Sequence, residues 1–202
     1  MSRVLSVAMM LMGMIGVSSS LPAEPVQYTA DKWHTRIYFT VNHMGLSNFS
    51  GRFLEHDINF IFDEEDMENS RVEVTVPVSS IDTFSPELNS KMGDEGFFDS
   101  ENHPALHFIT TNIEQIDATH ARMTGDMTIK GVTLPVAFDV LFNGKILHPR
   151  FNLNNAGFSA TATIDNRAFK VNPLPEWMLP SDTSIRIEME AFEGDSVPYY
   201  SN

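Results

Sequence analysis

The chain has 202 residues, of which 13 are Lys or Arg, 27 are Asp or Glu and none is Cys. Its length fits one domain plus a removable segment, and a hydrophobic content of 42% is enough for a sizeable core. The net charge of −14 argues against nucleic acid and against charge-driven docking on an anionic membrane, while the lack of Cys excludes disulfides, thiolate metal sites and cysteine nucleophiles.

Residues 1–23 differ in composition from the rest of the chain. Arg3 is their only charged residue, and a largely apolar run at 4–17 is followed by three serines and Leu-Pro-Ala. This order is typical of a secretory signal peptide, and the run is shorter than the roughly 20 apolar residues of a membrane span. We therefore predict a signal peptide at 1–23, cleaved after Ser20 or Ala23, and a periplasmic mature protein with no stable membrane span. An uncleaved N-terminal anchor is the alternative.

Beyond this segment, apolar and polar side chains alternate, which is typical of strands that bury one face. Turn-favouring residues such as Met44-Gly45 and Asn143-Gly144 separate the alternating segments. The eight predicted strands lie at 35–43, 57–63, 71–78, 106–108, 126–130, 133–142, 156–164 and 185–190. Because the charged side chains lie on the face opposite the apolar ones, we expect an all-β, eight-stranded antiparallel barrel or sandwich, apolar inside and wet outside. An outer-membrane pore has the reverse arrangement.

Two long segments, 82–104 and 165–183, interrupt the alternation with several prolines and glycines. The first is predicted to contain a short helix at 87–92, and the second holds too many prolines for a central strand. Loops of this length with aromatic residues often form the rim of a binding site. The rim candidates are Phe97, Phe98, Trp177 and Met178. The alternative is that these residues merely cover a sheet edge or the end of the core. Residues 194–202 are predicted to form a flexible tail.

The strand at 156–164 places three small side chains, Ala156, Ala160 and Ala162, on the same side as Phe158. Neighbouring strands carry larger residues at such positions, so the alanines would leave a space inside the barrel. Protein interiors avoid empty space, and a long, narrow apolar ligand would fill it. The alternative is a solid core in which larger residues from across the barrel occupy that space.

The sequence contains no specific catalytic or metal-binding pattern. Its seven histidines include no pair at helical spacing on one face, and the carboxylates are concentrated in solvated acidic loops. His43 shares its parity with the apolar residues of its strand and is expected to point inward near one barrel end. For His34 and His43 a hydrogen-bonding or structural role is favoured over a metal site. We predict no enzyme activity and no metal.

Four blocks of sequence, in this order, resemble the YceI-like family. The pattern H-T-x-I-x-F-x-V-x-H-x-G-x-S-x-x-x-G-x-F at 34–53 resembles its opening signature. Phe97-Phe98-Asp99 with His103-Pro104-x-Leu106-x-Phe108 is similar to its F-[FL]-[DN] and P-x-[IA]-x-F stretch. Residues 125–136 resemble its G-x-L-T-[IL]-x-G-x-T-x-P-V segment, and Gly157-Phe158-x-Ala160 its G-F-x-A run. The similarity spans about 26–193.

The resemblance implies a lipocalin-like eight-stranded barrel that is exported to the periplasm and forms a homodimer. It also implies an interior that holds a polyisoprenoid or similar long-chain amphiphile, including isoprenoid quinones. We therefore expect a lipid-binding barrel at 24–193 with no cofactor besides a bound isoprenoid-type lipid and no nucleic-acid partner. The predicted ligand-binding residues are Phe39, Val41, His43, Phe60, Val74, Lys91, Phe108, Phe138, Phe158, Ala160 and Trp177.

One stretch departs from the family pattern. Many members carry an Arg-Asp pair and a later basic residue before the F-[FL]-[DN] element, where this chain has Leu88-Asn89 and Gly93. Only Lys91 remains nearby to meet a phosphate, for which arginine is the usual partner. The sequence therefore favours a less anionic head group, such as a quinone, a prenyl alcohol or a fatty amide. An enzyme or redox accessory acting on isoprenoid quinones, and a filled-core interaction domain, are the competing functions.

Overall fold

The structure, a computed structural model, describes residues 25–199. The predicted signal peptide and both of its cleavage positions lie outside the described residues. Within them, no helix has the length and apolar character that crossing a bilayer requires. The strands are β1 (Val26–Ala30), β2 (Arg36–His43), β3 (Ser47–Phe53), β4 (Asp57–Phe62), β5 (Arg71–Pro77), β6 (Ile81–Asp82), β7 (Ala105–Gln115), β8 (His120–Ile129), β9 (Val132–Leu147), β10 (Asn154–Asp165) and β11 (Asp182–Glu193).

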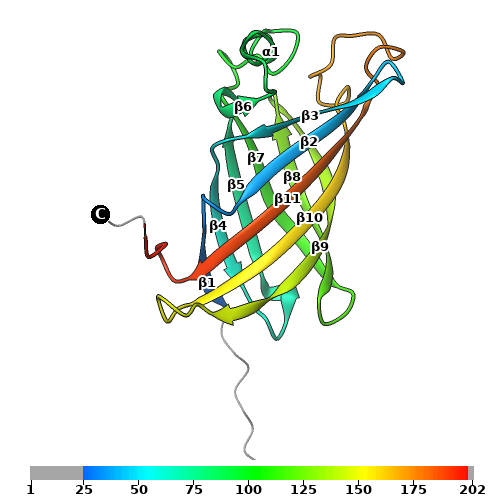
Figure 1. The fold of residues 1–202 in the computed structure, drawn as a ribbon. Coiled ribbons are helices and arrows are strands. Elements are labelled where there is room, and N and C mark those ends of the chain that lie inside the picture. The colour runs from blue at the N-terminus through cyan, green and yellow to red at the C-terminus, as the bar shows by residue number, and fades with distance from the viewer. Residues whose placement is uncertain (1–24, 200–202) are drawn as a thin grey trace, which may run out of the picture.

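Eight antiparallel strands close into a barrel in the order β1-β4-β5-β7-β8-β9-β10-β11, and the pairing of β11 with β1 completes the ring (Figure 1). β11 is long enough to have two neighbours on one side. Near its C-terminal end Ala191 pairs with Ala30 of β1, and nearer its start Ile185 pairs with Phe39 of β2. β2, β3 and β6 therefore extend the sheet at one end of the barrel (Figure 1). We call this end the upper end.

The predicted fold class, an eight-stranded antiparallel barrel with a short helix, is confirmed. The eight predicted strands correspond to β2, β4, β5 and β7 to β11, whereas β1, β3 and β6 were not predicted. β1 and β6 are short, and in β3 the residues Ser47, Asn48, Ser50 and Arg52 leave too few apolar positions for a clear alternation.

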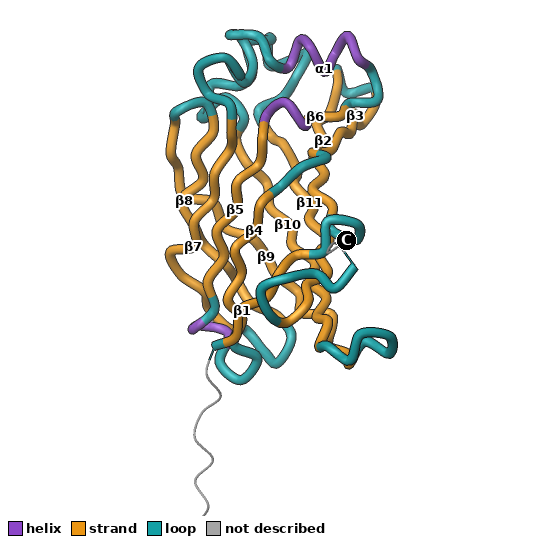
Figure 2. The backbone as a smooth tube through the Cα atoms, turned by 90° about the vertical axis from the view of Figure 1, so that its left-hand side faces the viewer, coloured by secondary structure: helices purple, strands orange, loops and turns teal. Residues whose placement is uncertain are grey.

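The helix α1 (Pro86–Met92) lies on top of the upper end, as Figure 2 shows. Its start is fixed by Ser85, whose side chain accepts a hydrogen bond from the backbone N–H of Leu88, and by Pro86 at the first helical position. Two short 3-10 helices, η1 (Met67–Asn69) and η2 (Val78–Ser80), complete the described helices. The proline-rich loop at 166–181 lies at the same end as α1 (Figure 1).

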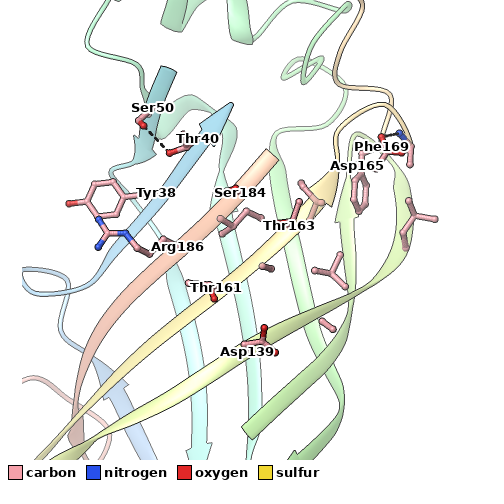
Figure 3. A pocket seen from close by; sticks show the side chains of 18 of the residues that line it. Tyr38, Thr40, Ser50, Asp139, Thr161, Thr163, Asp165, Phe169, Ser184 and Arg186 are labelled. Carbon is pink, nitrogen blue, oxygen red and sulfur yellow. Dashed lines mark hydrogen bonds between the residues drawn. The ribbon is translucent and has the colours of Figure 1, made fainter. Parts of the chain in front are cut away.

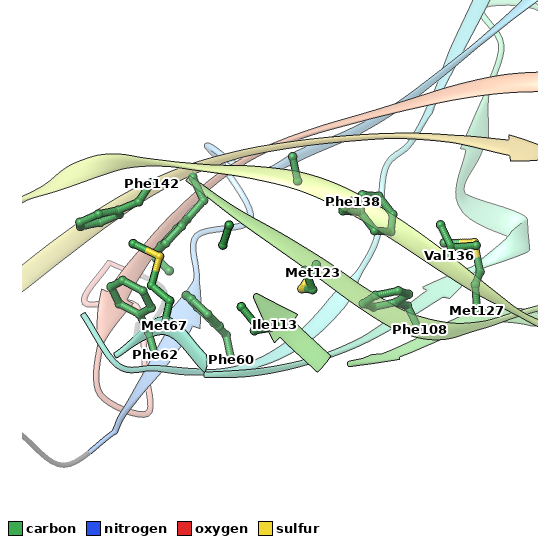
Figure 4. Close-up of a cluster of buried hydrophobic side chains, with 14 of the residues drawn as sticks. Phe60, Phe62, Met67, Phe108, Ile113, Met123, Met127, Val136, Phe138 and Phe142 are labelled. Carbon is green, nitrogen blue, oxygen red and sulfur yellow. The ribbon is translucent and has the colours of Figure 1, made fainter. Parts of the chain in front are cut away.

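The lower half of the barrel interior is packed with aromatic side chains (Figure 4). The ring of Phe158 lies 5.0 Å from the rings of both Phe60 and Phe62 and 5.3 Å from that of Phe142. The ring of Tyr28 packs at an angle against those of Phe60 and Phe62, with centroids 5.9 Å apart in both cases, and burial raises the pKa of its phenol. We call Tyr28, Phe60, Phe62, Phe142 and Phe158 the aromatic plug.

Two glycines of the family-like blocks allow aromatic rings to lie against the wall. A Cβ at Gly125 would stand 2.4 Å from the ring of Phe108 and 2.5 Å from the carbonyl oxygen of Ile109. A Cβ at Gly51 would stand 2.3 Å from the ring of Phe39, its cross-strand partner. Both glycines are therefore needed because a neighbouring ring occupies the space of a side chain.

In the segment where the sequence suggests a flexible tail, residues 194–199 lie against the outside of the barrel. Val197 is only 2% exposed, and the ring of Tyr199 stacks on that of Trp33 at 4.5 Å. Nearby, His34 Nδ1 lies 2.5 Å from the buried carboxylate of Asp31, which also accepts a hydrogen bond from the Tyr199 hydroxyl. His34 thus has the hydrogen-bonding role that the sequence favours.

Candidate functional site

The upper half of the barrel contains a cavity of about 490 Å³. Its wall is built from the inward faces of eight strands, and residues of α1 and of the loops at 93–104 and 166–181 contribute to its lining at the upper end. The apolar lining residues are Ile37, Phe39, Val41, Phe49, Phe53, Val74, Val76, Leu88, Met92, Phe97, Phe98, Leu106, Phe108, Met127, Ile129, Phe138, Ile164, Val171, Leu174, Leu179, Ile185 and Ile187. No Asp or Glu lines the cavity among the residues that the structure describes.

Several inward residues of the cavity are less buried than those of the aromatic plug below it. Phe39, Val41 and Val74 point inward, yet each retains partial exposure because it faces unfilled space. In the plug, by contrast, the inward residues Phe60 and Phe158 are buried. The interior is therefore half hollow and half packed, and the hollow half has the size and apolar character of a site for one small ligand.

The cavity reaches the surface at the upper end, where exposed polar side chains join its lining. His43 and Ser47 lie at the ends of the β2–β3 hairpin, and Lys91 lies in the last turn of α1. The backbone N–H of Met44 at the hairpin tip donates to the carbonyl oxygen of Met178, 2.9 Å away, which ties the hairpin to the 166–181 loop. These segments surround the mouth of the cavity.

The 166–181 loop is held in place by the guanidinium of Arg167. Its Nη2 donates to the carbonyl oxygens of Leu174 at 2.6 Å and Leu179 at 2.8 Å, and its Nε lies 2.6 Å from Glu176. Within the loop, the buried amide of Asn172 donates to the side-chain oxygen of Asn166 at 2.8 Å. A loop with several prolines and no regular structure is thus fixed by side-chain hydrogen bonds to its own carbonyl groups.

Replacing Arg167 by Met keeps the apolar stem but removes these hydrogen bonds. Because a hydrogen bond to a charged group contributes about 1.5–3 kcal/mol, we expect amide hydrogen exchange at residues 174–181 to become about 30-fold faster. Exchange measured by mass spectrometry tests this. The matched control is Arg186→Met on the outer wall, where the guanidinium stacks on Tyr38 at 4.9 Å. Equal acceleration in both variants would contradict a clamping role for Arg167.

The structure brings seven of the predicted site residues to the cavity and leaves four away from it. Phe39, Val41, His43, Val74, Lys91, Phe108 and Phe138 line the cavity. Phe60 and Phe158 belong to the aromatic plug, Ala160 packs in the same core cluster, and Trp177 is 64% exposed on the 166–181 loop. The predicted alanine space is not part of the cavity, because Ala156 and Ala160 lie in the packed core cluster and Ala162 packs against it. This was the alternative for that half of the interior.

Sequence reasoning missed the cavity residues that come from β3 and from the loops. Phe49 and Phe53 lie in the unpredicted strand β3, and Leu174 and Leu179 each precede a proline in an irregular loop. Of the rim candidates, Phe97 and Phe98 line the cavity, with Phe98 packed edge-on against Phe53 at 6.3 Å. The spacing Phe49-x-x-x-Phe53 within a polar strand was the available signal, since both residues fall on the same face.

A second hollow of about 1050 Å³ lies on the outer wall of the barrel (Figure 3). Hydroxyl groups predominate among its polar residues, including Thr161, Thr163 and Ser184, and Thr40 lies 2.8 Å from Ser50 across two strands. Arg122 and Arg186 add two positive charges, and Asp139 and Asp165 add two negative ones. This surface is a wide, wet concavity of the twisted sheet, and we assign no function to it.

Comparison with known proteins agrees with this architecture. A sequence model of the YceI-like domain matches residues 28–191 of the chain. A UPF0312 protein of Pseudomonas putida is 30% identical over 151 residues, covering 74% of this chain and 78% of that protein.

Two solved structures have a similar fold. The Campylobacter jejuni YceI protein gives a TM-score of 0.71 at 26% identity and covers 76% of this chain and 90% of its own. A polyisoprenoid-binding domain from Saccharophagus degradans gives a TM-score of 0.57 at 9% identity and covers 84% and 99%. At that identity, the second similarity concerns the fold alone.

Proposed function

Because this chain belongs to the YceI-like family, as its sequence motifs predicted, we propose that it is a binding and carrier protein for a long-chain amphiphilic lipid of the isoprenoid type. The lipid tail lies in the upper cavity and its polar end lies at the mouth. The fold shared with the polyisoprenoid-binding domain of Saccharophagus degradans supports this proposal.

The observation that carries the proposal is an apolar cavity of about 490 Å³ that opens at one end of the barrel. Burial of apolar surface is favourable by about 25 cal/mol per Å², so a hydrocarbon tail gains most by entering such a space. The absence of carboxylates from its described lining disfavours a cationic occupant, because a positive charge would have no partner there.

The mouth supports a head group that is neutral or weakly polar. Lys91 is the only Lys or Arg among the described lining residues, and His43 and Ser47 supply the other side-chain polar groups of the hairpin. A pyrophosphate is usually held by several cationic or amide donors. Acidic residues lie close to Lys91 in the chain at Glu87, Asp94 and Glu95. We therefore propose a quinone, a prenyl alcohol or a fatty amide as the ligand.

The lining residues favour binding without chemical conversion. General acid–base or nucleophilic catalysis needs a reactive side chain together with a partner that activates it. His43 has no carboxylate beside it in the described lining of the cavity. The proposed role is accordingly storage or transport of an unaltered lipid.

The setting proposed for this role is the periplasm, where the protein would arrive through cleavage of residues 1–23 and act as a homodimer. The composition of the N-terminal segment supports export, and the dimer rests on the family resemblance. N-terminal sequencing of the exported protein and analytical ultracentrifugation test the two statements separately.

Organic extraction of purified protein followed by mass spectrometry tests the ligand class. We expect about one lipid per barrel, with a neutral head group and a chemically unaltered tail. If prenyl pyrophosphates predominate, the proposed head group is wrong, and recovery of a converted product would indicate an enzyme. If no lipid is recovered and the protein also fails to bind added prenyl alcohols, the binding function itself is wrong.

A further inference from the structure

We propose that the floor of the cavity limits the length of the tail that this protein accepts to about 15–20 carbons. Longer tails would leave their remaining carbons at or outside the mouth. This inference rests on the proposed lipid-binding function and adds to it a specificity that depends on this chain's own side chains.

The floor is formed by Phe108 of β7 and Phe138 of β9. Their rings meet edge-to-face with centroids 5.2 Å apart, and the two residues are only 5% and 2% exposed. Both line the cavity and belong to the same buried cluster as the aromatic plug. The ring of Phe108 is held against Gly125, where even a Cβ would approach it to 2.4 Å. Phe108 is therefore confined by the wall behind it.

Below the floor, the aromatic plug leaves no continuation for a tail. Figure 4 shows Phe60, Phe62 and Phe142 gathered toward one end of the cluster and Phe108 and Phe138 toward the other. The rings of Phe62 and Phe142 are 5.2 Å apart, and those of Phe60 and Phe62 are 5.6 Å apart. A tail could pass only by displacing several packed rings, and densely packed interiors resist such displacement.

The volume of the cavity gives the number of tail carbons that fit above the floor. A methylene group is about as large as a water molecule, whose share of liquid volume is about 30 Å³. The cavity of about 490 Å³ therefore holds about 16 carbons. This corresponds to about three isoprene units of five carbons each, or to a palmitoyl-sized chain.

A chain-length series on the wild-type protein tests the limit. Prenyl alcohols of 10, 15, 20 and 40 carbons and straight-chain alcohols of 10–22 carbons compete with bound 11-(dansylamino)undecanoic acid, whose fluorescence reports displacement. We expect affinity to rise about fourfold per methylene, as burial of apolar surface predicts, and to level off near 16 carbons. A rise that continues to 40 carbons would overturn the length limit but leave the binding function intact. Failure of every alcohol to bind would instead overturn the binding function.

Two phenylalanines of the same strand provide matched variants. Phe138→Leu shortens a floor residue, whereas Phe142→Leu makes the same change in the plug, away from the cavity lining. We expect the first variant to move the plateau by two or three carbons toward longer tails and the second to leave it unchanged. If both move it equally, or neither does, the floor is wrongly assigned. Circular dichroism confirms that each variant is folded before binding is measured.

Discussion

Replacing Phe158 by Ala is expected to lower the free energy of unfolding by about 3–5 kcal/mol, the usual cost of removing a phenylalanine from a packed core. Phe158 is 7% exposed and contacts three other rings of the aromatic plug. Its loss leaves a void that the rigid neighbouring strands cannot close. Chemical denaturation in urea, followed by circular dichroism, measures the change.

The matched variant is Phe39→Ala in the cavity wall. We expect it to lower the free energy of unfolding by less than half as much as Phe158→Ala. The ring of Phe39 faces unfilled space on one side and therefore makes fewer contacts to lose. For lipid affinity we expect the reverse order, with Phe39→Ala more harmful than Phe158→Ala. Equal losses of stability in the two variants would contradict the division of the interior into a hollow half and a packed half.

Replacing Val74 by Trp is expected to weaken lipid binding more than a hundredfold. Val74 points into the cavity from β5, next to the floor residue Phe108 on the neighbouring strand. The tryptophan side chain has seven more heavy atoms than the valine side chain and would displace about four carbons of the tail. At about 0.8 kcal/mol per methylene, this corresponds to about 3 kcal/mol. Displacement of the dansylated fatty acid by farnesol measures the loss.

Thr75→Trp is the control for this substitution. Thr75 is the next residue of the same strand and points outward, where its hydroxyl lies 3.2 Å from His107 Nδ1. Because it does not line the cavity, farnesol affinity is expected to stay within about twofold of the wild-type value. The assignment of the cavity would be refuted by unchanged affinity in folded Val74→Trp protein.

The two pairs of variants separate stability from binding, and the same separation explains which residues the sequence could identify. Alternation with a period of two predicted that Phe39, Val41 and Val74 point inward. The same pattern predicted the same orientation for Phe60, Phe158 and Ala160. All six face the interior, but only the first three line the cavity. Parity reports which face of a strand is buried, and it contains no information about height along the barrel axis.

The structure also explains why two glycines occur in the family-like blocks, which the sequence alone did not. Gly51 and Gly125 occur in two of these blocks, and each lies beneath an aromatic ring of a neighbouring strand. From the sequence alone these glycines were only positions in a motif. The rings that require them, Phe39 and Phe108, come from other positions along the chain, and both line the cavity.

By itself, the amino-acid sequence determined the family, the all-β class, most strands, the helix α1 and the faces that each predicted strand turns inward. These properties follow from local periodicity, from capping and turn residues, and from motif order. The tertiary structure alone decided that β1 closes the ring, that Arg167 fixes an irregular loop, and that the interior is hollow above and packed below Phe108 and Phe138. Whether a space inside a barrel is filled depends on which side chains from distant strands meet at one height. Strand register and tilt set that height, and neither can be read from alternation along one strand.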